Sequence, residues 1–283
     1  MHLQNAYNPP SKPSLARLST HVKSCTLWVS TLALVIISGS HFPSTSRHSI
    51  RKIVIDAGHG GQDSGALGKF SKEKDITLQV ARQVGKLIEQ HMKPVKVIYT
   101  RHKDTFVALH ERARIANKNK ADLFISIHCN ADADRRGHGT ETFTMGLHTA
   151  PSNLDLMKRE NGVIRMEKQQ AKHYAGLNPN APESHILFSL YQHAYNTNSL
   201  YLAQHIESAL KTQLGRKSRG VKQAGFLVLW KTAAPSVLIE IGFITHPEEE
   251  KYLNQPAGQN QIARAIFEGL KQYKQHVEQH GKQ

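Results

Sequence analysis

The sequence has few cysteines and no long hydrophobic run. Its 283 residues contain two cysteines, Cys25 and Cys129. If an N-terminal segment is removed, Cys129 alone remains and no intrachain disulfide can form, so an oxidising compartment is neither required nor excluded. The longest apolar run, residues 27–37, falls short of the roughly 20 residues that span a bilayer comfortably.

Familiar nucleic-acid-binding patterns are also missing. The formal net charge of +15 calls for a polyanionic partner or surroundings. However, the chain has no zinc-finger spacing, no aromatic-basic RNA signature and no confined arginine-rich helix. Its basic residues are scattered over the whole length, and an anionic cell envelope fits them equally well. Charge alone therefore does not choose the partner.

The first fifty residues lack acidic side chains, since none occurs before Asp56. Basic residues precede the apolar run 27–37, and the small residues 38–40 follow it. This order is typical of a secretory signal. We therefore predict export to the periplasm or cell envelope. No clean Ala-x-Ala cleavage site is present, so an uncleaved inner-membrane anchor stays open for residues 1–50.

From residue 51 the chain alternates between strand and helix patterns. Predicted strands cover residues 53–56, 95–100, 123–128, 140–144, 225–229 and 236–241, and predicted helices cover 72–91, 109–117, 201–214 and 259–274. The alternation predicts one α/β domain, residues 51–276, with a mostly parallel twisted sheet and helices on both faces. Residues 147–199 read as an insertion with a possible helix at 157–167, and residues 277–283 as a polar tail.

Four separated residues carry the chemistry. His59 lies in a glycine-rich turn after the first strand, His128 ends a buried strand, Glu240 interrupts an apolar strand, and Glu73 begins a helix. Ligands of parallel sheets gather beyond the carboxyl ends of the strands, which predicts that these side chains converge. Two imidazoles, a carboxylate and a further glutamate form a minimal hydrolytic zinc site.

Each of these residues also has an ordinary structural reading. Glu73 alone would be assigned to the helix dipole, and a histidine at the position of His128 could be a satisfied core residue. Glu240 fits such a reading least, because an unpaired buried carboxylate is expensive. Glu141 could face the same pocket or the solvent. Cys129 is adjacent to His128 on the strand, so it points to the opposite face and is expected in the core.

Ordered motifs extend over nearly the whole predicted domain. The blocks are residues 55–66 around His59, 73–75, 100–112, 116–117, 121–131 around His128, 139–142, 223–226 and 235–243 around Glu240. On these blocks the chain resembles the amidase-3 family of zinc-dependent N-acetylmuramoyl-L-alanine amidases, peptidoglycan enzymes that act in cell separation. Ala57 stands where the family often has proline and Cys129 where it often has alanine, and neither departure affects a proposed ligand.

The resemblance implies specific roles. One Zn²⁺ per chain would be held by His59, Glu73 and His128, with Glu240 as the catalytic carboxylate. The enzyme would cut the amide bond between N-acetylmuramic acid and L-alanine of peptidoglycan. Apart from the resemblance, we expect a monomer without a nucleic-acid partner. The resemblance also suggests that residues 154–167 form an autoinhibitory helix with Glu160 near the metal, which an activator acting on the insertion would withdraw.

Other readings remain open from the sequence. The same ion and base would serve a zinc peptidase or a carbohydrate deacetylase, and the same fold could belong to a non-catalytic wall-binding protein. A nucleic-acid binder is suggested only by charge and is opposed by the export signal. The helix at residues 154–167 could be an ordinary amphipathic surface helix.

Overall fold

The computed structural model describes residues 49–146, 151–168, 173–174 and 195–280. Residues 1–48 of the predicted signal or anchor segment lie outside these ranges. Among the described helices, none combines the length and the apolar character needed to cross a membrane.

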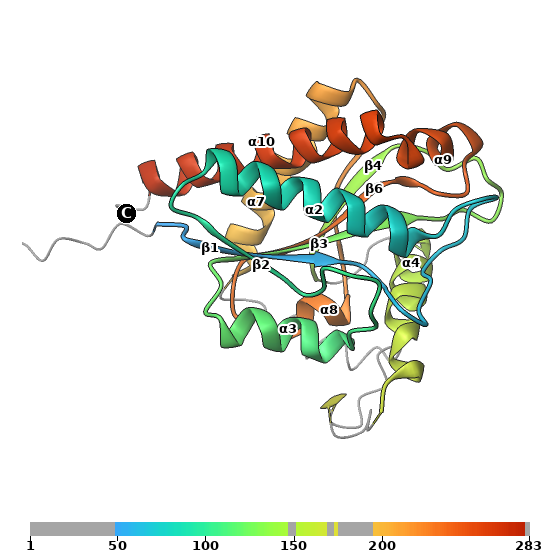
Figure 1. The fold of residues 1–283 in the computed structure, drawn as a ribbon, viewed down its shortest axis with the longest axis horizontal. Helices are drawn as coiled ribbons and strands as arrows, with labels where there is room; N and C mark the ends of the chain where they lie inside the picture. Colours follow the sequence, from blue (N-terminus) through green and yellow to red (C-terminus); the bar gives the residue numbers. More distant parts are fainter. Residues whose placement is uncertain (1–48, 147–150, 169–172, 175–194, 281–283) are drawn as a thin grey trace, which may run out of the picture. The chain divides into compact units, whose positions relative to one another are not determined.

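A six-stranded sheet forms the centre of the domain, in the order β2-β1-β3-β6-β4-β5 (Figure 1). The strands are β1 (Lys52–Ala57), β2 (Lys96–Tyr99), β3 (Leu123–Asn130), β4 (Thr140–Met145), β5 (Ser218–Ala224) and β6 (Ser236–Phe243). Strands β2, β1, β3 and β6 run parallel, β4 pairs antiparallel with β6, and β5 runs parallel to β4. The predicted mostly parallel α/β domain is confirmed. The reversed direction of β4 was not predicted.

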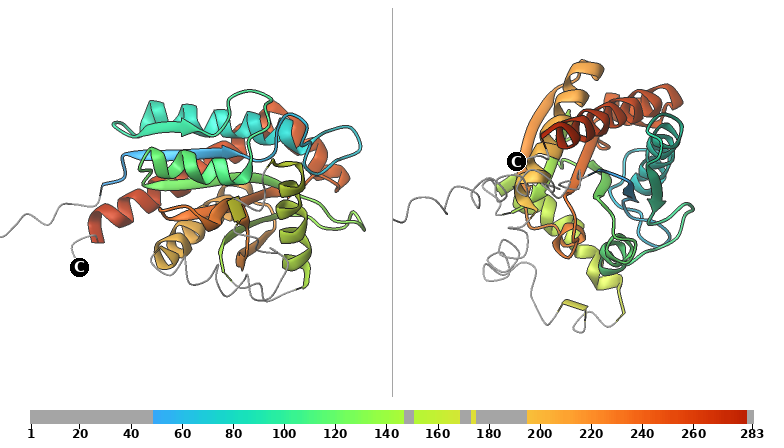
Figure 2. Two further views of the ribbon diagram at one scale, coloured as in Figure 1. Left: turned by 90° about the horizontal axis from the view of Figure 1, so that it is seen from below. Right: turned by 90° about the vertical axis from the view of Figure 1, so that its left-hand side faces the viewer.

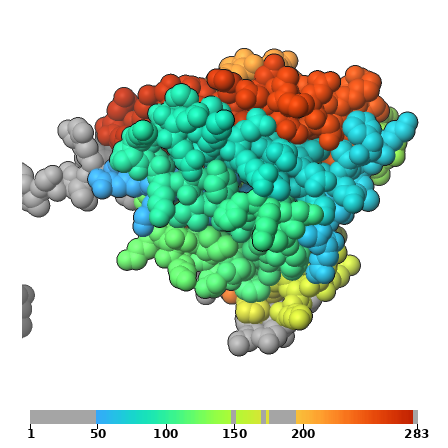
Figure 3. Space-filling view, viewed as in Figure 1, coloured from blue at the N-terminus to red at the C-terminus, as the bar shows by residue number. Residues whose placement is uncertain are grey.

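Helices cover both faces of the sheet (Figures 1 and 2). On one face lie α2 (Glu73–His91), α7 (Asn196–Leu214) and α10 (Pro256–His280), and on the other lie α3 (Leu109–Lys118) and the short α8 (Leu227–Trp230). The insertion contributes α4 (Pro151–Asn161) and the 3-10 helix η1 (Gly162–Met166), and α9 (Pro247–Asn254) precedes α10. In Figure 3, side chains of α2, α3 and α10 cover the viewed side of the domain.

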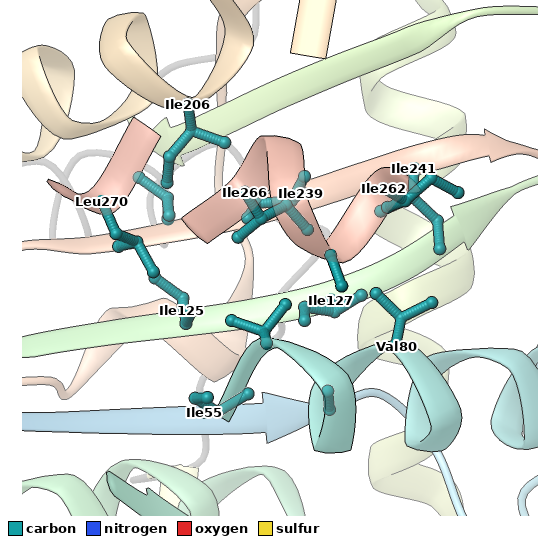
Figure 4. Close-up of a cluster of buried hydrophobic side chains, with 14 of the residues drawn as sticks. Ile55, Val80, Ile125, Ile127, Ile206, Ile239, Ile241, Ile262, Ile266 and Leu270 are labelled. Carbon is teal, nitrogen blue, oxygen red and sulfur yellow. The ribbon is translucent and has the colours of Figure 1, made fainter. Parts of the chain in front are cut away.

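The larger core lies between the sheet and the first helical layer. Ile125, Ile127, Ile239 and Ile241 extend from the central strands toward Ile262 and the other apolar residues of the helices (Figure 4). All residues of β3 and β6 are buried. A strand buried on both faces needs a nearly continuous apolar run, so the histidine and glutamate that interrupt these runs require a special reason.

Two sequence predictions differ from the structure near the second face. Residues 225–229 were predicted as a strand, but β5 ends at Ala224 and α8 begins at Leu227. The prediction was wrong because the apolar run there fills the second core as a helical turn, whose first amide, Leu227 N, donates to Asn161 Oδ1 (2.9 Å). Short apolar runs do not separate strand from buried helix by pattern alone.

The predicted helix ends also moved. The helix expected at residues 157–167 starts earlier, as α4, and continues into η1. The last helix, α10, runs to His280, into the segment 277–283 that was predicted as a polar tail. The helix α9 was not predicted; Pro247 at its start and the acidic first turn are ordinary helix-start signals.

The described part of the insertion is attached to the domain by hydrogen bonds and by packing. Asn161 Nδ2 donates to Gly225 O (2.9 Å), and Leu156 and Met157 pack in the second core. Further along, Glu167 Oε1 accepts the amide of Leu109, the first residue of α3 (2.7 Å). A carboxylate at that place satisfies a free helix amide and complements the helix dipole. These contacts hold α4 against the carboxyl ends of the strands.

Candidate metal centre

The turn that carries His59 is unusually tight. His59 has φ 62°, a left-handed conformation that non-glycine residues rarely adopt. A Cβ added to Gly58 would lie 2.6 Å from His128 Cε1, so only glycine allows the two segments to approach this closely. Strained backbone that the surroundings hold in place is common at functional sites.

Two buried arginines, Arg101 and Arg112, hold this turn through hydrogen bonds to its backbone carbonyls. Arg101 Nη2 donates to Gly58 O (2.8 Å), and Arg112 Nη2 donates to His59 O (2.9 Å). Arg112 Nη1 also donates to Asp56 Oδ1 (2.7 Å). Burial alone would raise the pKa of Asp56, but the Arg112 guanidinium and the hydroxyls of its neighbours hold that pKa below 3.8. The arginines fix the turn through backbone carbonyls and one buried ion pair.

The structure brings three of the predicted residues together with Glu160. His59 Nε2 lies 3.1 Å from Glu73 Oε2 and 3.1 Å from Glu160 Oε2. His128 Nδ1 lies 3.0 Å from Glu73 Oε1 and 3.2 Å from Glu160 Oε2. One ligand atom from each of the four residues lies within 4.8 Å of the others, and all four side chains are buried.

Neighbouring groups orient the members of the cluster. His59 Nδ1 donates to Asp63 Oδ2 (2.8 Å), so Nε2 is the ring nitrogen that is directed to the cluster. The Glu73 oxygens accept the amides of Cys129 (2.9 Å) and Ala66 (2.8 Å). Such contacts fix both the tautomer of the histidine and the rotamer of the carboxylate.

The two carboxylates of the cluster favour positive charge on the groups between them. Burial favours neutral imidazoles, but Glu73 and Glu160 outweigh it and raise the pKa of His59 well above 6.5. The same two carboxylates raise the pKa of His128 to about 9 against the effect of burial. Burial also opposes ionisation of Glu73, yet the charge of His59 lowers the pKa of Glu73 to about 2. The two carboxylates thus stabilise whatever cations lie between them, and a divalent ion would take the place of the imidazole protons.

The donor set fits a metal ion. Among the described residues, His59 Nε2 and Glu160 Oε2 have no hydrogen bond of good geometry, although they lie 3.1 Å apart. Two imidazole nitrogens and a carboxylate are ligands that zinc prefers, with a further position left for water or substrate. The enclosed space beside His59, His128 and Glu160 is about 10 Å³, roughly the minimum for one water.

Glu160 reaches the cluster from the insertion. From the sequence, this residue is expected near the metal. It is the penultimate residue of α4, and its Oε1 accepts Arg159 Nε (3.0 Å). Arg159 also donates to Ala131 O (3.2 Å) and Asn130 Oδ1 (3.1 Å), at the end of β3. Burial opposes ionisation of Glu160, but the charge of His59 and the nearby His128 imidazole hold the pKa of Glu160 well below 4.5. Arg159 therefore links Glu160 and the insertion to the end of β3.

Glu240 lies directly beside the cluster without belonging to it. Its Cα pairs with that of His128 in the parallel register of β6 and β3, which puts both side chains on one face of the sheet. The side chain is fully buried, and among the described residues neither oxygen has a hydrogen-bond partner. Burial, reinforced by the charges of Glu160 and Glu73, raises the pKa of Glu240 well above 4.5. A carboxyl in this state is suited to accept and return a proton.

Glu141 is buried and so does not face solvent, one of the two options left by the sequence. It lies opposite Glu240 in the antiparallel β4–β6 pair but outside the four-residue cluster. Its carboxylate accepts hydrogen bonds from Asn130, Arg219 and Lys222. Cys129 is buried in the larger core, as predicted.

Sequence reasoning missed the supporting residues of the site. Asp63, four residues after His59, was part of a matched block but received no role. Arg112 was also matched without a role, although a buried arginine near a conspicuous aspartate such as Asp56 points to an ion pair. Nothing in the sequence signals the contacts of Arg159, because they depend on how the insertion folds back on β3.

Comparisons with known proteins identify the family of the chain. Residues 53–272 match the Amidase_3 family, described as N-acetylmuramoyl-L-alanine amidase. The chain is 38% identical over 226 residues to the N-acetylmuramoyl-L-alanine amidase AmiA of Escherichia coli K12, covering 79% of this chain and 76% of that protein. It is 34% identical to AmiC of Escherichia coli O6:H1, covering 78% of this chain and 52% of that protein.

Solved structures give the same result. An N-acetylmuramoyl-L-alanine amidase from Clostridium difficile 630 matches with a TM-score of 0.59 and 28% identity, over 80% of this chain and 97% of that one. The CwlD amidase from Clostridioides difficile, solved in complex with the GerS lipoprotein, matches with a TM-score of 0.59 and 27% identity, over 80% and 99%. The chain belongs to the Amidase_3 family of N-acetylmuramoyl-L-alanine amidases.

Proposed function

We propose that this peptidoglycan amidase is a zinc enzyme in which His59, Glu73 and His128 hold one ion and Glu240 moves the proton. The observation that carries the proposal is the convergence of the two imidazoles and Glu73 next to a buried, unpartnered Glu240. Zinc, when bound, would supply a Lewis acid that polarises the lactyl carbonyl and makes water more acidic.

The protein's own contribution to the reaction centres on Glu240. Its carboxylate would take a proton from the attacking water and pass it to the L-alanine nitrogen as the amide bond breaks. Its raised pKa favours holding that proton between the two steps. Asp63 would keep the His59 ring in the required tautomer, while the amides of Ala66 and Cys129 keep Glu73 in place.

We further propose that residues 154–167 regulate access. Glu160 occupies the space between the imidazoles, which supports an autoinhibitory role for this part of the insertion. An activator acting on residues 147–199 would have to withdraw Glu160. The relative CwlD was solved with a lipoprotein. An activator of this chain would bind the insertion at residues 147–199, most of which lies outside the described residues.

The cellular setting follows from the same proposal. Residues 1–50 would direct export or anchor the chain at the inner membrane, and the catalytic domain would extend from residue 51 to the end of α10 at His280. The enzyme would act as a monomer on periplasmic peptidoglycan during wall remodelling and daughter-cell separation. The basic composition suits an anionic envelope.

The decisive experiment combines metal analysis with digestion of purified cell wall. Wild type and Glu240→Gln would be compared with and without a chelator. We expect about one zinc per chain in both proteins, and free stem peptides with an N-terminal alanine from untreated wild type alone. Products lacking that terminus would indicate a peptidase or deacetylase instead, and full activity of Glu240→Gln would remove the proposed base.

A further inference from the structure

A polar cavity of about 620 Å³ lies beside the candidate metal cluster, between α4, the segment 130–137 that begins at the end of β3, and the strands β4 and β5. Its lining includes Arg159 of α4, Glu141 of β4, and Arg219 and Lys222 of β5. None of the four cluster residues lines it. Arg159 forms the boundary, because it lines the cavity and also hydrogen-bonds Glu160.

The wall of the cavity at β5 carries excess positive charge. Arg219 and Lys222 share a single carboxylate, that of Glu141. The side chain of Glu141 is 3% exposed, whereas those of Arg219 and Lys222 are 29% and 22% exposed. The acid thus lies at the floor, and the two cations are the accessible groups.

Acidic residues elsewhere in the lining do not cancel this charge locally. Asp132 accepts hydrogen bonds from the backbone amides of Arg136 and Gly137 and so stabilises the loop to which it belongs. Asp134 pairs with Arg136 at the exposed rim. Asp155 is exposed on the opposite wall, on α4. The cations of β5 therefore remain available to an anionic group that enters the cavity.

The cavity lies within reach of the proposed reaction centre. His128, Glu240 and Glu141 occupy paired positions on the neighbouring strands β3, β6 and β4 and share one face of the sheet. Neighbouring strands are about 4.8 Å apart, so the row from His128 to Glu141 spans roughly 10 Å. An extended peptide covers about 3.3 Å per residue and needs roughly three residues for that distance.

The chemistry of peptidoglycan selects which arm of the substrate fits. The carboxyl of muramic acid is consumed in the amide bond, so the N-acetylated glycan beside it is uncharged. The stem peptide, in contrast, carries free carboxylates. We propose that the cavity binds the stem peptide and that Lys222 and Arg219 pair with one of its carboxylates. This proposal rests on the amidase function and adds the side on which the peptide lies.

The test uses two soluble muropeptides with the same glycan and peptide. In one, all peptide carboxylates are free, and in the other all are converted to carboxamides. Hydrolysis is measured for the protein with an unaltered cavity and for the double variant that combines Lys222→Gln with Arg219→Gln. Each of the two is prepared once with Glu160 intact and once with Glu160→Gln. Lys271→Gln on α10 is the matched control, since it removes one cation from the other face of the sheet.

We expect the unaltered cavity to favour the acidic muropeptide. The double variant should lose about tenfold in kcat/KM on the acidic substrate, through KM, as expected for one charged hydrogen bond. Its kcat/KM on the carboxamide should be unchanged, and Lys271→Gln should behave like wild type. If the double variant unfolds, Lys222→Gln alone serves, because Arg219 still pairs with Glu141.

The alternative outcomes separate the two proposals. The peptide subsite would be overturned if the protein with the unaltered cavity hydrolysed both muropeptides equally well. It would also be overturned if the double variant lost the same factor in kcat/KM on both. The amidase function would stand in either case. If neither muropeptide is cleaved in either background, the amidase proposal itself fails. Calorimetric binding of the two muropeptides to the same proteins would then still decide whether the cavity recognises carboxylates.

Discussion

Glu240 lies directly opposite His128 in the parallel pairing of β6 with β3, and both of its carboxylate oxygens are buried without a hydrogen-bond partner among the described residues. An unpartnered carboxyl at such a place costs folding free energy. Its placement beside one of the imidazoles of the cluster is the clearest sign that function, not stability, put it there.

Glu240→Gln should separate activity from stability. We expect the rate of wall hydrolysis to fall by about 10³-fold, within the range of a lost general base. The Tm should stay the same or rise, because a buried carboxyl with a strongly raised pKa is replaced by a neutral group of equal size. Activity and thermal unfolding would be measured on the same preparations. Glu89→Gln, at an exposed position of α2, is the control. A large fall in Tm would assign Glu240 a structural role.

Arg159→Gln and Glu160→Gln should both raise basal hydrolysis. Glu160 fills the space between the imidazoles, and Arg159 ties it to Asn130 and Ala131 at the end of β3. Removing either group weakens the closed position of α4, and we expect an increase of roughly tenfold, since one charged hydrogen bond is lost. Lys158→Gln changes an exposed neighbour on the same helix and should leave the rate unchanged. Unchanged or lower rates in both variants would contradict autoinhibition.

The sequence predicted which side chains lie close together more fully than it predicted the details of the fold. His59, His128 and Glu240 stood out locally because each interrupts or follows a strong strand pattern. Glu73 did not, since an acidic residue at a helix start has an ordinary explanation in the helix dipole. Only the ordered family motifs moved it to the cluster, where the structure places it.

What the sequence could not predict depends on contacts between distant segments. Residues 227–230, which overlap the predicted strand, form a turn of helix whose first amide, that of Leu227, is accepted by Asn161 of the insertion. The polar strand β5 has a weak pattern, since most of it is only half-buried at the sheet edge. The link from Arg159 to Glu160 likewise arises only once α4 is folded against β3. Local pattern carries no information about such long-range pairings.

Removing the metal should lower stability as well as activity. Without an ion, the buried cluster places Glu73 and Glu160 around two imidazoles. Zinc at a thousandfold excess over its dissociation constant would stabilise the fold by about 4 kcal/mol, or roughly 10 °C in Tm for a domain of this size. Thermal unfolding with chelator, and after zinc is restored, would measure this shift. His59→Ala should abolish most of it; an equal shift in that variant would place the ion elsewhere.

Asp56→Asn should destabilise the domain in a pH-dependent way. The variant leaves the Arg112 guanidinium buried without its carboxylate, which costs about 3–5 kcal/mol. The pKa of Asp56 lies below 3.8 in the folded protein, because Arg112, Ser126 and Thr100 together outweigh the effect of burial. The ion pair therefore contributes fully above the unfolded pKa, and its contribution is lost as the pH falls through the lower folded value.

Urea unfolding of wild type and Asp56→Asn would test this linkage. The difference in unfolding free energy should be constant between pH 7 and pH 5 and should narrow only below about pH 4, where the unfolded aspartate binds its proton. Asp104→Asn, at an exposed carboxylate that also pairs with a cation, should cost under about 1 kcal/mol. A difference that already narrows between pH 7 and pH 5 would show that the Asp56 carboxylate is not held by Arg112 as the geometry requires.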